Sequence, residues 1–386
     1  MQRMSVSNVK RVTPLNARRQ SQGGRGRFPI YVLTGFLGSG KTTALNFLAK
    51  QSEFVRTLVL INEFGEIGLD HDLVTFSGDE LAVQMASGCV CCTIRGDLVK
   101  TLHDAPGRFS RGGVPWFDRV VIETTGLADP APILHTLMNE PTLVSRYRLQ
   151  GVISTVDAVN GENSLDRHSE AAKQVAVADR LLLTKLDLAE ESRLLPLTNR
   201  LRALNPAAPH YPAHNGAFDL DGLLSQGPYE PSSKVSDVLE WLRDEAYEGS
   251  SSPSSNARHT SHDIDHGHHH DLNRHDDEIR ATCITLEEPV SGKAVDAWLE
   301  ALLRWRGEDL LRVKGIIHVA ELDAPMIIHG VQHIFHPPFV LPEWPSEDRR
   351  TRIVFIARNI EEETLRETLE VFRSAAGLLD TPSANF

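Results

Sequence analysis

The sequence contains little of several features, and each absence excludes a class of protein. Only four cysteines occur among 386 residues, which excludes a secreted scaffold held together by disulfides. No apolar run approaches the roughly 20 residues that cross a bilayer, and no segment near the N-terminus has the apolar stretch of a secretory signal. We therefore expect a cytoplasmic protein that has no membrane partner.

A basic surface is also missing from most of the chain. The formal net charge is -12 and the sequence pI is about 5.8, whereas binding to a phosphate backbone requires a basic surface. We expect no nucleic-acid partner. Hydrophobic residues make up 41% of the sequence, which is ample for a folded core. Because 386 residues exceed the size at which one core usually keeps growing, we expect two domains.

The first 28 residues differ from the rest because they contain no acidic residue. Their basic residues are Arg3, Lys10, Arg11, Arg18, Arg19, Arg25 and Arg27. We interpret residues 1–28 as a disordered basic tail, which this composition favours. An organelle transit peptide has a similar composition and is the alternative, although no other feature of the chain requires it.

Short apolar runs alternate with helical stretches between Pro29 and about Pro212. Runs rich in Val, Ile and Leu are expected to form strands buried on both faces; these are Tyr31–Leu33, Leu58–Ile61, Val120–Ile122, Gly151–Thr155 and Leu181–Leu183. The expected helices are Thr42–Ala49, Glu170–Ala178 and Glu190–Leu204. The pattern predicts an α/β domain over residues 29–225, with a parallel sheet flanked by helices.

The remaining chain divides into a linker and a second domain. Residues 226–277 include a Ser-rich stretch followed by a His- and Asp-rich loop and are interpreted as a linker. Residues 278–375 are expected to form a smaller C-terminal α/β domain, followed by a tail at 376–386. The expected elements of this C-terminal domain are strands at Ile279–Leu286, Leu311–Val319 and Ile353–Ile356, and helices at Val290–Trp305 and Glu361–Phe372.

A phosphate-binding loop follows the first expected strand. Residues 35–42 read Gly-Phe-Leu-Gly-Ser-Gly-Lys-Thr, which fits the G-x-x-x-x-G-K-[ST] pattern of P-loop NTPases in the required strand-loop-helix setting. We favour nucleotide binding over a glycine-rich turn without a ligand. Lys41 is expected to bridge the terminal phosphates and Thr42 to hold Mg²⁺. The predicted nucleotide-binding residues here are Gly35, Gly38, Ser39, Gly40, Lys41, Thr42 and Thr43.

An acidic residue ends the strand Val120–Ile122. Parallel sheets bind ligands at the carboxyl ends of their strands, so Glu123 is expected to act on the water shell of Mg²⁺. Gly126 lies three residues further on, where its backbone N–H is expected to contact the γ-phosphate. Together with Lys41 and Thr42, these two residues form the predicted catalytic set.

The base-binding residues are predicted by the sequence Thr184-Lys185-Leu186-Asp187. The Watson–Crick edge of guanine presents two adjacent donors, which the single carboxylate of Asp187 accepts together. Lys185 is expected to lie along the purine ring. The commoner form of this motif has Asn at the position of Thr184, which alters the hydrogen bond that braces the loop.

Three of the four cysteines, Cys89, Cys91 and Cys92, fall within four residues. Clustered thiolates bind zinc, copper(I) or related metals, and Glu63 or Glu66 is a candidate to complete a tetrahedral set. The same spacing contains a C-x-x-C pair, Cys89 and Cys92, so redox chemistry is the alternative. We favour a metal site.

Taken together, these motifs resemble those of the CobW-type family of P-loop GTPases. The resemblance covers nearly the whole chain after the tail, including residues 35–43, 62–68, 88–92, 123–126 and 184–187, and a C-terminal segment at 311–315. It implies slow GTP hydrolysis, zinc or cobalt binding at the three cysteines, and transfer of the metal to a client metalloprotein. A nucleotide- or metal-dependent homodimer is a further expected partner.

The linker contains seven of the 17 histidines, at positions 259–275. Imidazoles and carboxylates at mixed spacing bind Zn²⁺, Co²⁺ or Ni²⁺ loosely, which favours metal collection over a purely solvating linker. The candidate ligands are His266, His268, His269 and His270.

The sequence therefore predicts a metallochaperone that uses GTP, Mg²⁺ and Zn²⁺, with Co²⁺ as a second metal. We expect loss of the γ-phosphate to alter the metal site and release its cargo. Two alternatives are a non-catalytic zinc-storage protein and an ATP-using enzyme on the same scaffold.

Overall fold

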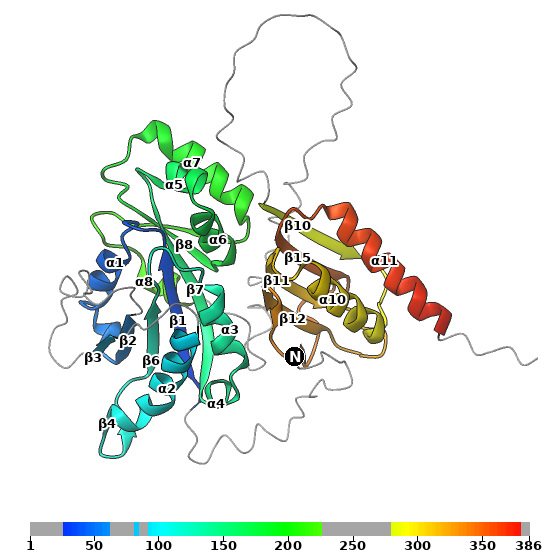
Figure 1. The fold of residues 1–386 in the computed structure, drawn as a ribbon, viewed down its shortest axis with the longest axis horizontal. Helices are drawn as coiled ribbons and strands as arrows, with labels where there is room; N and C mark the ends of the chain where they lie inside the picture. Colours follow the sequence, from blue (N-terminus) through cyan, green and yellow to red (C-terminus); the bar gives the residue numbers. More distant parts are fainter. Residues whose placement is uncertain (1–25, 62–80, 85–91, 226–278, 380–386) are drawn as a thin grey trace, which may run out of the picture.

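The computed structural model describes residues 26–61, 81–84, 92–225 and 279–379 (Figure 1). A nucleotide-binding domain and a C-terminal domain each have their own sheet. Among the described helices, none is both long and apolar enough to span a bilayer.

The sheet of the nucleotide-binding domain has seven strands, all paired in parallel. In spatial order they are β3 (Leu81–Gln84), β2 (Thr57–Ile61), β6 (Arg119–Glu123), β1 (Phe28–Gly35), β7 (Tyr147–Asp157), β8 (Arg180–Thr184) and β9 (His210–Pro212). Each of the five expected strands lies within an observed one, which confirms the parallel α/β sheet. β3 and β9, at the two edges, were not expected.

Helices cover both faces of this sheet. They are α1 (Lys41–Leu48), α2 (Cys92–Arg108), α3 (Ala131–Asn139), α4 (Pro141–Val144), α5 (Gly161–Arg167), α6 (Ser169–Val177), α7 (Glu191–Leu204) and α8 (Leu220–Ser225). A 3-10 turn at Ser52–Phe54 and a hairpin of β4 (Ser110–Arg111) and β5 (Val114–Pro115) complete the domain.

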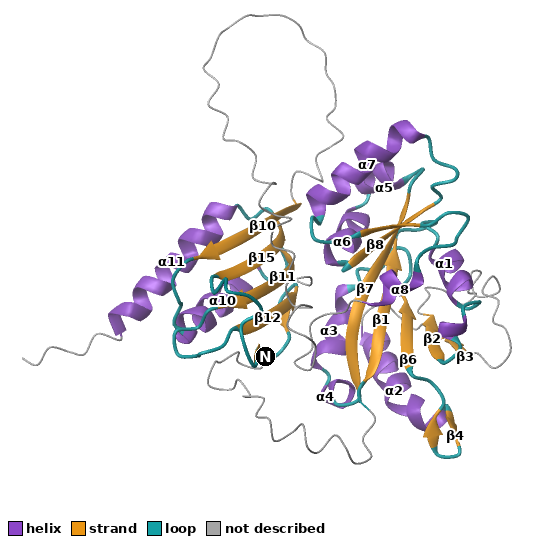
Figure 2. Ribbon diagram, turned by 180° about the vertical axis from the view of Figure 1, so that it is seen from behind, coloured by secondary structure: helices purple, strands orange, loops and turns teal. Residues whose placement is uncertain are grey.

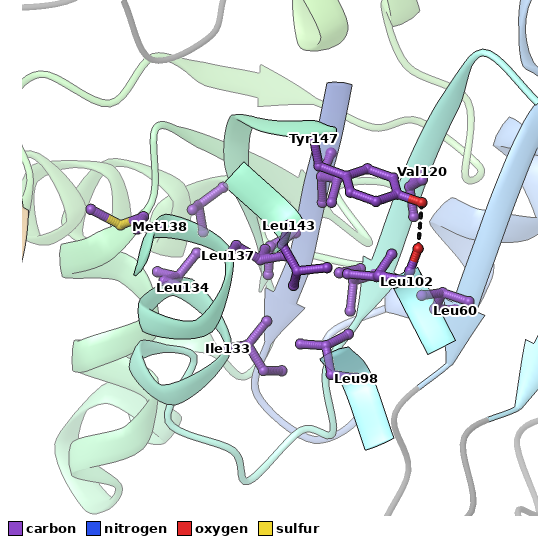
Figure 3. Packing of buried hydrophobic residues seen from close by; sticks show 14 of the residues in the cluster. Leu60, Leu98, Leu102, Val120, Ile133, Leu134, Leu137, Met138, Leu143 and Tyr147 are labelled. Carbon is purple, nitrogen blue, oxygen red and sulfur yellow. Dashed lines mark hydrogen bonds between the residues drawn. The ribbon is translucent and has the colours of Figure 1, made fainter. Parts of the chain in front are cut away.

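Successive residues of a strand point to opposite faces of the sheet, and each face has its own hydrophobic cluster. Ile30 and Val32 pack towards α2 and α3, whereas Tyr31 and Leu33 pack towards α1. Figure 3 shows the first of these clusters, in which the hydroxyl of Tyr147 donates to the carbonyl of Leu102 at 2.8 Å. Each fully buried aliphatic side chain contributes about 1.5–3 kcal/mol, so these clusters stabilise the sheet whose strand ends carry the predicted site.

The C-terminal domain is built on an antiparallel sheet. Its strands in spatial order are β10 (Ile279–Leu286), β15 (Thr351–Arg358), β11 (Leu310–Ile317), β12 (Met326–Val331) and β13 (Ile334–Phe335), and β14 (Phe339–Val340) also pairs with β12. α10 (Gly292–Arg306) and α11 (Glu362–Leu379) lie on the face away from the nucleotide-binding domain (Figure 2). The smaller α/β domain is therefore present.

Several boundaries in this domain differ from the sequence prediction, and the strand expected to continue to Val319 ends at Ile317. The helix expected from Val290 begins at Gly292, because Val290 forms a β-bridge with Val319. The last helix continues to Leu379, beyond both Phe372 and the expected domain end at residue 375.

The two domains share a buried contact. The Arg312 side chain on β11 donates to the carbonyl of Val177 and pairs with Asp179, and Lys314 lies 3.5 Å from the same carboxylate. Burial raises the pKa of Asp179, but the two cations outweigh it and hold the pKa well below its usual value. The C-terminal domain is thereby fixed to the end of α6.

Candidate functional site

The phosphate loop connects β1 to α1 through residues 36–40. Gly38 and Gly40 have φ of 69° and 94°, which side chains with a Cβ atom seldom adopt. At Gly35, an added Cβ would lie 2.1 Å from Thr155 Oγ1, so only glycine fits between β1 and β7. The glycines of the motif therefore serve the turn and the packing behind it.

Lys41 begins α1 and is almost completely buried. Its Nζ donates to the carbonyls of Gly35 at 2.9 Å and Phe36 at 3.2 Å, so the ammonium group lies inside the loop. Thr42 and Thr43 follow in the first turn of α1, half-buried and exposed respectively. Backbone N–H groups at the start of a helix, together with an ammonium group, favour a bound anion.

A second layer of polar contacts supports the loop from β7. Ser39 Oγ and Thr155 Oγ1 lie 2.6 Å apart, and both residues are buried. Thr155 also donates to the carbonyl of Thr34 at 3.3 Å. Ser39 therefore faces the strand, and its side chain holds the loop in position.

Glu123 and Gly126 lie beside the phosphate loop. Glu123 pairs in register with Leu33 of β1 and Ile61 of β2, and it is 7% exposed. A Cβ at Gly126 would lie 2.7 Å from the backbone nitrogen of Leu37, so the two loops are in direct contact. The structure brings both residues to the carboxyl edge of the sheet, where the sequence predicted them.

The base loop begins at the end of β8. Thr184 is buried, and its hydroxyl donates to the carbonyl of Ser39 at 2.7 Å. Lys185 has a left-handed backbone with φ of 58°, and its Nζ lies 2.7 Å from Asp157 Oδ2. Asp157 ends β7 and also accepts the backbone N–H groups of Val159 and Asn160.

Asp157 is a site residue that sequence reasoning missed. Its partial burial raises the pKa of the carboxyl, but the hydrogen bonds from Lys185 and the two backbone N–H groups outweigh burial and lower the pKa. Asp157 is therefore an anion that orients Lys185. Its place at the end of a buried strand was the available signal, since Asp157 stands two residues past the expected strand end at Thr155.

A pocket lies beside the base loop. It is lined by Gly40, Thr43, Ala44, Leu182, Thr184, Lys185, Asp187, Leu188, Ala213, Asn215, Gly216 and Phe218. The pocket joins the phosphate loop to the exposed Asp187 and has mixed apolar and polar walls, as expected for a purine site.

Comparison with known families matches both domains. The model of the CobW/HypB/UreG nucleotide-binding domain matches residues 29–212, and the model of the cobalamin synthesis protein cobW C-terminal domain matches residues 279–373. The chain belongs to the CobW family. Both matches fall within the observed domains.

Named relatives of this CobW-family chain include zinc proteins. It is 31% identical to the zinc chaperone YjiA of Escherichia coli over 337 residues, which cover 87% of this chain and 96% of that protein. It is 30% identical to the zinc-regulated GTPase metalloprotein activator 1 of Schizosaccharomyces pombe over 357 residues, which cover 86% of this chain and 82% of that protein. These two matches extend across both domains.

Two solved structures also match this CobW-family fold over 90% of this chain and 100% of theirs. The Zn(II)-bound YjiA GTPase from E. coli has a TM-score of 0.64 at 28% identity. A Zn(II)-bound triple mutant of YjiA, with alanine in place of one glutamate and two cysteines, has a TM-score of 0.64 at 29% identity.

The predicted metal ligands of this CobW-family chain lie mostly outside the described residues. These are Cys89, Cys91, Glu63, Glu66, His266, His268, His269 and His270. Cys92 is the first residue of α2, and β2 ends at Ile61, in register with Glu123. Within residues 26–61, 81–84, 92–225 and 279–379, no group of three or more His, Cys, Asp or Glu side chains forms a metal site.

Proposed function

We propose that the protein is a GTP-hydrolysing metallochaperone that binds zinc or cobalt through Cys89, Cys91 and Cys92 and transfers the metal to a client metalloprotein. The observation that carries this proposal is the convergence of three loops at one edge of the sheet. Gly126 touches Leu37, and Thr184 is hydrogen-bonded to Ser39, so the three predicted nucleotide-binding segments form one site.

GTP is proposed to bind with its phosphates on the loop at residues 35–42 and its base over Lys185. Lys41 would exchange its carbonyl partners for phosphate oxygens, which are stronger acceptors because they are charged. Asp187 would accept both donors of the guanine edge. Asp157 would hold Lys185 beside the base, since their side chains are already 2.7 Å apart.

Mg²⁺ is proposed to be held by the Thr42 hydroxyl, with Glu123 acting through water, and would compensate the negative charge that develops on the leaving GDP. The site residues fit such an ion, because an almost buried carboxylate ends the strand beside the phosphate loop. The Gly126 N–H is proposed to contact the γ-phosphate. We expect slow intrinsic hydrolysis, as the resemblance to the CobW-type GTPases implies.

The metal motif is proposed to respond to the nucleotide because the chain between β2 and α2 contains it. β2 ends at Ile61, in register with Glu123, and α2 begins at Cys92; β3 (Leu81–Gln84), which pairs with β2, is the described segment between them. Glu63 or Glu66 is proposed as a further ligand, and His266, His268, His269 and His270 as a second, looser collecting site.

The proposal is tested by measuring zinc content and GTP hydrolysis of the purified protein. Lys41→Ala is expected to abolish hydrolysis and retain zinc, whereas Cys91→Ser is expected to lose zinc from the cysteine site and retain GTP binding. Because the Zn(II)-bound YjiA triple mutant keeps zinc without three of its side chains, a variant that lacks the four candidate ligands among the linker histidines, at positions 266, 268, 269 and 270, is measured in parallel.

Two outcomes would contradict the proposal. Stoichiometric zinc with no GTP turnover under any metal condition would favour the storage alternative. Tighter binding of ATP than of GTP would favour the ATP-using alternative, and Asp187→Ala distinguishes the two nucleotides because it should reduce only GTP affinity, by about tenfold.

A further inference from the structure

The turn between β12 and β13 of the C-terminal domain packs against α3 of the nucleotide-binding domain. Val331, at the end of β12, is 1% exposed and belongs to the core cluster formed by α3 residues such as Ile133 and Leu134. His135 on α3 lies with its Nε2 2.8 Å from the carbonyl of Val331, and its ring meets that of His333 edge-on at 4.8 Å. This turn is therefore docked by both apolar and polar contacts.

Gln332, in the same turn, has an unusual backbone. Its φ of 51° lies in the left-handed region, which two-residue hairpin turns normally fill with Gly, Asn or Asp. The Gln332 side chain reaches across the domain boundary and donates to Asp129 Oδ2 at 3.1 Å. Glycine would adopt this backbone conformation with less strain than glutamine does. The contact with Asp129 explains why a glutamine occupies the position.

Asp129 belongs to the loop that touches the phosphate site. It stands three residues after Gly126, whose backbone is packed against Leu37. The carbonyls of Gly126 and Ala128 accept hydrogen bonds from the Nε2 of Gln174 on α6, at 3.2 and 3.0 Å. The loop is thus held by the phosphate loop, by α6 and by the C-terminal domain.

We infer that the position of the β12–β13 turn depends on whether the γ-phosphate is present, and that the hydrogen bond between Gln332 and Asp129 couples the two. The inference rests on the proposed binding of GTP, in which the Gly126 N–H contacts the γ-phosphate. Only two residues separate Gly126 from Asp129, so a movement at one shifts the other. Coupling of this kind is reciprocal, and the C-terminal domain therefore alters the preference of the site for GTP over GDP.

The test uses the full chain and two nucleotides, GDP and a non-hydrolysable GTP analogue. Dissociation constants are measured for the wild type, Gln332→Ala and Gln332→Gly, with Arg304→Ala as control because Arg304 forms an exposed pair with Glu300 on α10. The glycine variant removes the amide and relieves the left-handed strain, so it separates the contact from the backbone. Thermal melting shows that each variant is folded.

The ratio of the two dissociation constants is expected to change at least threefold in both Gln332 variants and to stay within twofold in Arg304→Ala. Hydrogen exchange of the amides around Val331 is expected to differ between the GDP and GTP-analogue complexes of the wild type. A ratio unchanged in both Gln332 variants, with nucleotide binding intact, would overturn the inference and leave the proposed function standing. A wild-type protein that binds neither nucleotide would overturn both.

Discussion

The hydroxyl of Thr184 donates to the backbone carbonyl of Ser39 at 2.7 Å, and it joins the base loop to the phosphate loop. The methyl group of Thr184 also lies near Gly40, where an added Cβ would be 3.2 Å away. The commoner Asn at this position has a longer side chain, but threonine fills the space against Gly40. Thr184 therefore braces the site, although the sequence alone suggested that the brace was altered.

Replacing Thr184 with valine is expected to weaken GTP binding by about fivefold, because one buried hydrogen bond is worth on the order of 1 kcal/mol. Valine keeps the shape of threonine and removes only the hydroxyl. Titration with a fluorescent GTP analogue measures the effect. Thr184→Ser keeps the donor and should bind close to wild type; weakening in the serine variant with normal binding in the valine variant would show that the methyl contact, and not the hydrogen bond, matters.

Replacing Gly126 with alanine is expected to reduce the rate of GTP hydrolysis at least tenfold. The new Cβ would lie 2.7 and 2.8 Å from the backbone N and Cα of Leu37, so one of the two loops must move. Single-turnover hydrolysis measures the effect. The matched control is Gly107→Ala in α2, where an added Cβ meets nothing within 4 Å and should leave the rate unchanged. A normal rate in Gly126→Ala would exclude a close contact between these loops in the reacting complex.

Replacing Asp179 with alanine is expected to destabilise the chain by about 3 kcal/mol, because it removes the carboxylate that Arg312 and Lys314 contact in the buried interface. Denaturant unfolding of the full chain measures the change. Asp118→Ala removes an exposed pair with Arg56, which solvent screens, and should leave stability close to that of the wild type. If the loss of stability in Asp179→Ala were as small as that in Asp118→Ala, the domain interface would not depend on this ion pair.

Stability is expected to fall as the pH decreases from about 6.5 towards 4, in part because of His336. Burial, with a smaller effect of the Arg27 guanidinium, lowers the pKa of His336 to about 4 from an ordinary value of 6.5. In this window the unfolded chain takes up a proton that the folded protein does not, so acid favours unfolding, by at most about 2 kcal/mol at pH 5.

The comparison for this prediction is His336→Gln, which does not titrate. Unfolding is measured at pH 8 and pH 5, and the loss of stability between them should be smaller in the variant than in wild type. An identical loss in the two proteins would assign the acid sensitivity to other groups, such as His210, whose pKa burial also lowers to about 4.

The central strands and the phosphate loop could be predicted because their signals are local. Continuous Val, Ile and Leu runs identify buried strands, and the glycine positions identify the turn before Lys41. The edge strand β9 (His210–Pro212) could not be predicted, since a three-residue segment with two half-buried side chains has no periodic pattern. Helix α3 was missed, although its apolar residues fit one helical face.

The contacts between segments could not be predicted from the sequence. The pairing of Lys185 with Asp157 and of Gln332 with Asp129 joins residues 28 and 203 positions apart, and nothing in the local pattern connects them. The placement of Glu123 beside the phosphate loop was predictable only because parallel strands end at a common edge. The predicted metal ligands, except for the start of α2 at Cys92, lie outside the described residues and stay a prediction.

Val331 has a consequence for how the protein is made. It completes a core that otherwise consists of residues from the first half of the chain. A ribosome adding 5–20 residues per second needs on the order of ten seconds to travel from the end of the first matched domain, at residue 212, to residue 331. During that interval the apolar surface of α3 that Val331 covers in the finished protein is exposed on the first domain. Exposed apolar surface favours aggregation or binding by chaperones until the C-terminal domain has been synthesised.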